Sequence, residues 1–78
     1  MKTIKEHDRI ILTEAIEEYG LLPGDLGAVV FVHGNGKAYE VEFVTLDGKT
    51  AAIVELDSRQ VRVADTHEIP HARPLTAA

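Results

Sequence analysis

The sequence predicts an all-β protein, a small SH3-like barrel of about five antiparallel strands around a central three-stranded meander. Two turn signals, Asn35-Gly36 and Asp47-Gly48, separate three runs of strand-forming residues between positions 26 and 56. A further β-branched run precedes this ribbon at residues 8–12, and a short one follows it at residues 61–63. The chain of 78 residues suffices for one domain, and curling its sheet into a barrel removes most of the exposed strand edge.

The N-terminal half begins with a strand over residues 8–12, followed by the segment "TEAIEEYG". That segment has two interpretations, a helical turn capped by Thr13 or a long folded-back loop. The next segment, "LLPGDLG", favours a type II turn, because Pro23 presets φ and Gly24 takes the φ > 0 position. Asp25 is then placed to bond backbone amides nearby, and a strand follows over residues 26–32.

Two more strands are predicted over residues 38–44 and 50–56, after which "LDSRQ" indicates a tight helical turn before the last strand at 61–63. We therefore place the barrel domain at residues 1–64. Residues 65–78 have two prolines and no periodicity, which predicts a flexible or surface-draped tail.

The two turns independently predict one register for the middle strand. As two-residue loops, the first pairs Val41 with Val30, and the second pairs Phe43 with Ala52 and Val44 with Ala51. Both place the same side of residues 38–44 toward the core. The inward residues of the meander are predicted to be Ala28, Val30, Val32, Tyr39, Val41, Phe43, Ala52, Val54 and Leu56. The first and last strands are expected to cover them with Ile10, Leu12, Val61 and Val63.

The outer face of the meander is the main functional clue, because it combines apolar residues with carboxylates. The predicted apolar residues are Val29, Phe31, Val44 and Ile53. The carboxylates beside them are Glu40, Glu42 and Glu55. Such a strip suits a protein partner that offers an apolar anchor flanked by Lys or Arg. The competing interpretation is that strand bending buries Phe31 or Val29, or that the tail covers the strip with Ile69, Pro70 and Leu75.

Charge and composition restrict the class of partner. The formal net charge is -5, and the basic residues are scattered singly, which disfavours nucleic-acid binding and favours a protein with a basic patch. The chain has no cysteine, no apolar run long enough to span a membrane, and a charged N-terminus. We therefore expect a cytoplasmic protein without disulfides or membrane contact.

The sequence gives little support to catalysis, and we predict no catalytic residue, no cofactor and no metal site. Ser58, the sole serine, has no histidine nearby in the sequence to activate it. His67 and His71 lie four apart, but Pro70 between them interrupts a regular helix. The acidic loop that contains Tyr19 lacks the aromatic residues of a proline-peptide groove.

The pattern "D-R-I", "Y-G-L", "G-D-L-G-A-V-V", "A-Y-E-V-E-F" and "D-G" over residues 4 to 63 resembles a family of small bacterial proteins classified as a domain of unknown function. The resemblance implies an SH3-like barrel, encoded in bacteria beside small genes of which some look like toxin–antitoxin partners. It implies no activity and no catalytic residues. The "G-D-x-G-x-V-V" part is also similar to KOW-type barrels and to small barrel subunits of photosynthetic electron-transfer complexes.

Together these features predict a non-enzymatic protein-interaction module, with an antitoxin-like neutraliser as its more specific version. Two alternatives remain open. One is a nucleic-acid-binding KOW-like barrel, and the other is a small accessory subunit of a larger enzyme or electron-transfer complex.

Overall fold

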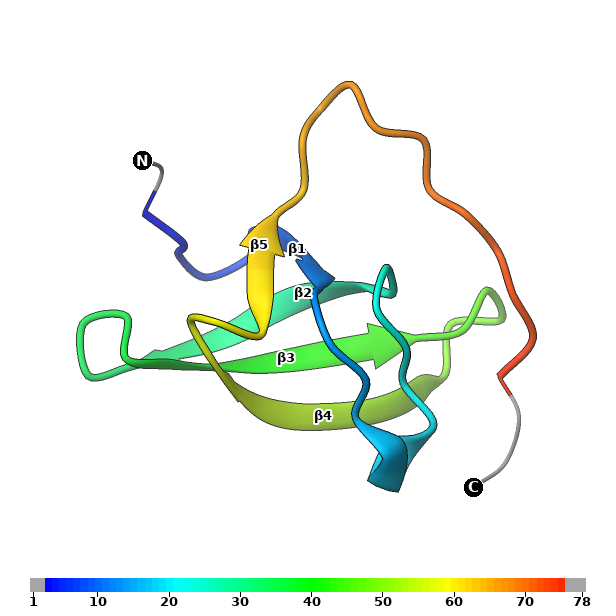
Figure 1. Ribbon diagram of the computed structural model, residues 1–78, viewed down its shortest axis with the longest axis horizontal. Coiled ribbons are helices and arrows are strands. Elements are labelled where there is room, and N and C mark those ends of the chain that lie inside the picture. The colour runs from blue at the N-terminus through cyan, green and yellow to red at the C-terminus, as the bar shows by residue number, and fades with distance from the viewer. Residues whose placement is uncertain (1–2, 76–78) are drawn as a thin grey trace.

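A computed structural model of the protein describes residues 3–75 (Figure 1). Its five strands are β1 (Arg9–Leu12), β2 (Leu26–His33), β3 (Ala38–Val44), β4 (Thr50–Asp57) and β5 (Val61–Val63). They pair antiparallel in one sheet of order β4-β3-β2-β1-β5. This confirms the predicted all-β class, the central meander β2-β3-β4 and the long loop after the first strand. The comparison with SH3 domains stays a prediction.

The long loop between β1 and β2 folds back on itself. Its short 3-10 helix η1 (Glu17–Tyr19) lies between Ile16 and Leu21, which form an isolated antiparallel bridge. The turn predicted at Pro23-Gly24 is present, since the Asp25 N–H donates to the Leu22 carbonyl at 3.1 Å and Gly24 has φ +96°. The loop therefore contains both a helical turn and a folded-back segment, which the sequence left as alternatives. Thr13 does not cap this turn, because the N-cap residue is Ile16 and no side chain caps it.

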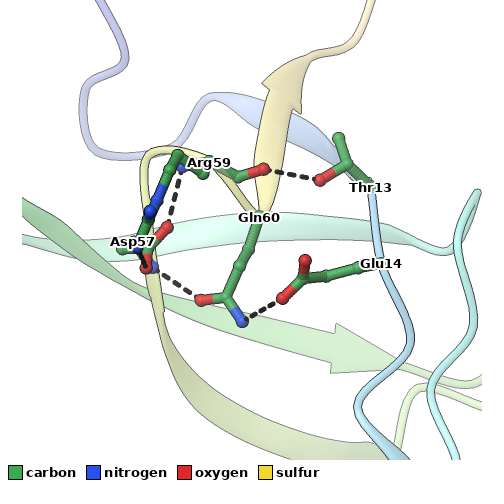
Figure 2. Close-up of polar contacts among 5 residues, drawn as sticks. All are labelled: Thr13, Glu14, Asp57, Arg59 and Gln60. Carbon is green, nitrogen blue, oxygen red and sulfur yellow. Dashed lines mark hydrogen bonds and ion pairs between the residues drawn. The ribbon is translucent and has the colours of Figure 1, made fainter.

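The sheet curls because β4 and β5 lie at its opposite edges although only residues 58–60 separate them. Figure 2 shows the contacts that join these residues to the chain just after β1. The Thr13 hydroxyl donates to the Arg59 carbonyl at 2.8 Å, and the Thr13 N–H donates to the Gln60 carbonyl at 2.8 Å. The Gln60 amide group donates to Glu14 Oε1 at 2.9 Å. These bonds hold the two ends of the sheet together and give a small barrel-like fold.

The helical turn predicted before the last strand is a single tight turn. The Gln60 N–H donates to the Asp57 carbonyl at 3.0 Å, and the Arg59 N–H donates to the Asp57 carboxylate at 2.8 Å. In the other direction, the Asp57 N–H donates to Gln60 Oε1 at 2.9 Å. The turn is short because β5 begins at Val61, directly after Gln60.

The β3–β4 turn differs from the predicted two-residue type I′ turn. The Gly48 N–H donates to the Thr45 carbonyl and the Thr45 N–H to the Lys49 carbonyl, both at 2.9 Å, so the loop has three residues. Gly48 has φ +84° while Asp47 does not have positive φ, which excludes type I′ and fits a type I turn with a glycine bulge. A second irregularity, between Phe43 and Val44, shifts the pairing back by one residue.

The three-residue loop and the irregularity between Phe43 and Val44 shift the pairing by one residue in opposite directions, so most of the predicted register is retained. The predicted pairs Phe43↔Ala52, Val41↔Val54 and Glu40↔Glu55 are all present. The predicted pair Val44↔Ala51 is wrong, because Val44 pairs with Thr50.

A bulge between Val29 and Phe31 changes the β2–β3 register. Val29, not Val30, pairs with Val41, while Val32 pairs with Tyr39 as predicted. Two predictions are therefore wrong: Val29 is fully buried with 0% of its surface exposed, and Val30 is 40% exposed on the outer face. Ala28 is displaced in the same way, because it pairs with Glu42 on the outer face.

The core lies on the concave side of the curled sheet, and its composition otherwise follows the prediction. Its buried residues are Ile10, Leu12, Leu21, Val29, Tyr39, Val41, Phe43, Ala52, Val54, Leu56 and Val61. Val63 is half-buried, and Val32 packs against the core from a half-buried position. Gly27 occupies the inward place predicted for Ala28, because a Cβ there would lie 2.5 Å from Val41 Cγ1.

The tail leaves β5 and arcs around one side of the barrel (orange to red in Figure 1). It forms no strand over residues 64–75, but two arginines attach it. Arg62 donates to both carboxylate oxygens of Glu68, at 2.8 and 2.7 Å, and Arg73 reaches Asp25 in the turn before β2. Between these two attachments the tail lies along the barrel beside Leu26, at the start of β2.

Candidate functional site

The outer face of the meander exposes four apolar side chains, which we call the outer apolar patch: Val30, Phe31, Val44 and Ile53. Phe31 is 47% exposed and Ile53 is 53% exposed, as the alternation along β2 and β4 predicts. Val29 does not belong to this patch, because the bulge turns it into the core. Val30 takes its place, and sequence reasoning missed it because nothing distinguishes two adjacent valines by composition.

Two of the predicted carboxylates lie in the same row as Phe31. Phe31 pairs with Glu40 on β3, and Glu40 pairs with Glu55 on β4. Two like charges directly opposite each other are destabilising by a few tenths of a kcal/mol, roughly, unless a cation lies beside them. This pair therefore favours a cation at the centre of the face.

His33 hydrogen-bonds to Glu40 and was not among the predicted site residues. Its Nε2 lies 2.7 Å from Glu40 Oε2, and its ring packs edge-on against Phe31 with the ring centroids 4.6 Å apart. The signal was available in the sequence, since His33 follows Phe31 by two positions on the same strand and shares its face. Glu55, on the far side of Glu40, makes no side-chain hydrogen bond to any residue between positions 3 and 75.

Glu42 lies in the neighbouring row, between Ala28 and Ile53. The Thr50 hydroxyl donates to Glu42 Oε2 at 2.5 Å, which fixes the carboxylate beside Ile53. Val44 lies farther along β3, about 13 Å from Glu40 at the rise of an extended strand. The apolar residues thus form a strip along the meander, with carboxylates between them.

The tail leaves the centre of this strip open. Ile69, one of the residues expected as a cover, is 90% exposed, and the tail runs beside Arg9 and Leu26 on the other half of the face. Leu75 lies near Val44 at one end of the strip. Phe31 and Ile53 keep about half of their surface in solvent with the tail in place.

Three of the arginines form ion pairs with carboxylates. Arg59 pairs with Asp57 at 3.4 Å, Arg62 with Glu68 at 2.7 Å, and Arg73 with Asp25 at 2.5 Å. These ion pairs leave fewer cations available to a polyanion, and the face itself carries carboxylates. The face therefore combines apolar surface with negative charge.

The tail contains the two histidines that the sequence analysis considered as metal ligands, His67 and His71. Within residues 3–75, no three His, Cys, Asp or Glu side chains lie close enough to hold a metal ion. His67 contacts Asp65 through its N–H at 2.9 Å and through Nδ1 at 3.4 Å. In the same part of the chain, no helix has the length and apolar character required to cross a membrane.

Comparison with known proteins identifies a family for most of the chain. The family model of a domain of unknown function, DUF4926, matches residues 6–63, which contain all five strands and the outer apolar patch. This confirms the resemblance to a family of unknown function. No curated protein and no solved structure matches the chain. With about three quarters of its length covered by that model, the chain belongs to the DUF4926 family.

Proposed function

We propose that this protein is a cytoplasmic, non-enzymatic interaction module that docks a basic protein partner through the outer face of its meander. The observation that supports the proposal is the exposure of Phe31 and Ile53 directly beside Glu40, Glu42 and Glu55. The apolar side chains would supply affinity. The carboxylates would select and orient a partner that carries Lys or Arg beside its apolar anchor.

The expected contribution of the apolar contact is substantial. An aromatic side chain buries 150–250 Å², roughly, when it is fully enclosed, and about half of Phe31 is still exposed. Covering that half would stabilise a complex by about 2 kcal/mol. A partner cation between Glu40 and Glu55 would also relieve their mutual repulsion.

The test is partner capture by matched variants. We expect Phe31→Ala to weaken capture of the native partner at least tenfold, because it removes the central apolar contact, while the melting temperature changes by less than about 3 °C. Leu22→Ala is the control, since Leu22 is 46% exposed, close to the 47% of Phe31, but lies outside the meander. Capture from the native cell followed by titration of the purified partner gives both values.

Two results would contradict the docking proposal. One is equal partner affinity for Phe31→Ala and Leu22→Ala. The other is a large loss of stability in Phe31→Ala, which would assign Phe31 to the core.

The antitoxin-like version of the proposal has its own test. If the gene adjacent to this one encodes a toxin, its expression alone should stop growth, and co-expression with this chain should restore growth and yield a complex. Stoichiometric co-purification with a large enzyme assembly would instead favour an accessory subunit. Binding to generic DNA or RNA that falls steeply with salt would favour the KOW-like alternative.

A further inference from the structure

Arg73 of the tail is bound by a pocket at the end of the β1–β2 loop. Its Nε donates to Asp25 Oδ1 at 2.9 Å and its Nη2 donates to Asp25 Oδ2 at 2.5 Å, a bidentate arrangement. The same Nη2 donates to the Gly20 carbonyl at 2.9 Å. Three directed bonds to one guanidinium constitute specific recognition of arginine, because an ammonium group does not reproduce this planar geometry.

The acceptors of the pocket are held in place without the tail. The Leu22 N–H donates to Asp25 Oδ2 at 2.8 Å, and the Asp25 N–H returns a bond to the Leu22 carbonyl. Gly20 ends the 3-10 helix with φ +69°. The Leu21 N–H, which shares a peptide group with the Gly20 carbonyl, donates to the Ile16 carbonyl at 3.1 Å and so fixes the orientation of that carbonyl. Burial acts to raise the pKa of Asp25, but the bonds from Arg73 and the Leu22 N–H lower it overall.

An apolar depression continues from the arginine pocket along the tail. The barrel contributes Leu21, Leu26, Phe43, Val44 and Ala51 to its lining. The tail contributes Pro70, Ala72 and Leu75, and Leu75 remains exposed for 43% of its surface. Leu75 therefore covers the depression only in part.

Receptor and occupant belong to different parts of the chain. Gly20, Asp25 and the barrel residues of the depression lie within the region 6–63 that matches the family, whereas Arg73 lies outside it. The contact spans 48 positions in sequence, and η1 and the tight turn before β2 build the pocket without contribution from the tail.

We propose that Asp25 and Gly20 form a recognition site for an arginine of a partner protein, presented in an extended segment with a large aliphatic residue two positions later. In the free protein the tail occupies this site as an internal competitor, and the partner segment displaces it. Gly20 and Asp25 lie outside the outer apolar patch, and the depression shares only Val44 with it, so the inference holds whether or not Phe31 contacts a partner.

The experiment removes the Arg73 side chain from the site in the full chain and then adds the tail segment as a separate peptide. The variant Arg73→Gln is titrated with a capped synthetic peptide of residues 69–75, "IPHARPL", and the amide signals of Gly20, Leu22 and Asp25 are followed by NMR. We expect saturable shifts at these amides. The wild-type protein should bind the peptide at least tenfold more weakly, because its tethered tail competes at an effective concentration of order millimolar.

Two matched changes test the arginine itself. A peptide carrying Arg73→Gln, and the double variant Arg73→Gln/Asp25→Asn with the original peptide, should each bind roughly tenfold more weakly. Retained amide dispersion in every variant shows that the barrel is folded.

Three results would overturn the inference. They are the absence of saturable shifts in the Arg73→Gln variant, equal binding of the two peptides, and a wild-type dimer that Arg73→Gln abolishes. The last result would show that the tail occupies the pocket of a second copy.

Discussion

Val29 and Val30 are identical neighbours that the backbone of β2 directs to opposite sides of the sheet. The bulge between Val29 and Phe31 inserts one residue without a partner on β3. Strict alternation before and after the bulge then places Val29 in the core and both Val30 and Phe31 outside. One inserted residue thus determines the membership of both the core and the outer apolar patch.

This arrangement predicts opposite responses to the same truncation. Val29→Ala removes two buried carbons and leaves a cavity, and we expect it to reduce the free energy of unfolding by about 2–3 kcal/mol. Val30→Ala removes exposed surface, and its cost should stay below about 1 kcal/mol. Urea denaturation of the two variants measures both values, and the reverse order would restore the register predicted from the turns.

The paired strands were predictable because the sequence of β3 alternates strictly between apolar and charged residues, with Tyr39, Val41 and Phe43 on one side. The turn type was not, since Asp-Gly suits both a type I′ turn and a type I turn with a glycine bulge. The bulge in β2 was hidden by a continuous apolar run. The Arg73–Asp25 contact was equally inaccessible, because no local pattern links residues 48 positions apart.

At the scale of elements, the turn between β4 and β5 closes the molecule. The side chain of Gln60 serves both sides of this junction, accepting from the Asp57 N–H and donating to Glu14, each at 2.9 Å. Gln60 therefore stabilises the turn internally and connects it to the loop after β1 (Figure 2). The neighbouring Arg59 contributes through its backbone, because its side chain is 88% exposed.

We expect Gln60→Ala to reduce the free energy of unfolding by about 1–2 kcal/mol, because the partly buried Asp57 N–H loses its acceptor. Arg59→Ala is the matched control, and its cost should be within about 0.5 kcal/mol, since it removes an exposed ion pair at 3.4 Å. Thermal denaturation of both variants provides the comparison. Equal melting temperatures would show that the side-chain bonds of Gln60 do not stabilise the junction.

At the scale of the whole molecule, two ion pairs, Arg62–Glu68 and Arg73–Asp25, attach the tail to the barrel. Arg62 and the Asp65 N–H lower the pKa of Glu68 from its ordinary 4.5 to about 2, and the pKa of Asp25 is also below its ordinary 3.8. A carboxylate whose pKa is lowered in the folded protein contributes its full stabilisation when the pH is above its ordinary pKa. This stabilisation is lost as the pH falls through the lowered pKa. Among residues 3–75 the core contains no buried polar or charged side chain, so it lacks this dependence.

The tail should therefore detach in acid before the barrel unfolds. We expect heteronuclear NOE values of residues 65–75 to be high at about pH 6 and to fall between about pH 4 and 2, while the amide signals of the strands stay dispersed. In Arg73→Gln the values for residues 70–75 should be low at every pH. Values that do not change with pH would show that apolar contact, not charge, holds the tail.

The position of β1 has a consequence for how the chain acquires its structure. β1 lies between β2 and β5, so it stays half-paired until Val61–Val63 arrive, and the Thr13–Arg59 contact closes a loop of 46 positions. Such distant contacts slow folding and make it cooperative. An incomplete nascent polypeptide that stops before Val61 would present a naked strand edge, which favours aggregation. Folding of this small barrel can therefore be completed only after its last strand, β5, has been synthesised.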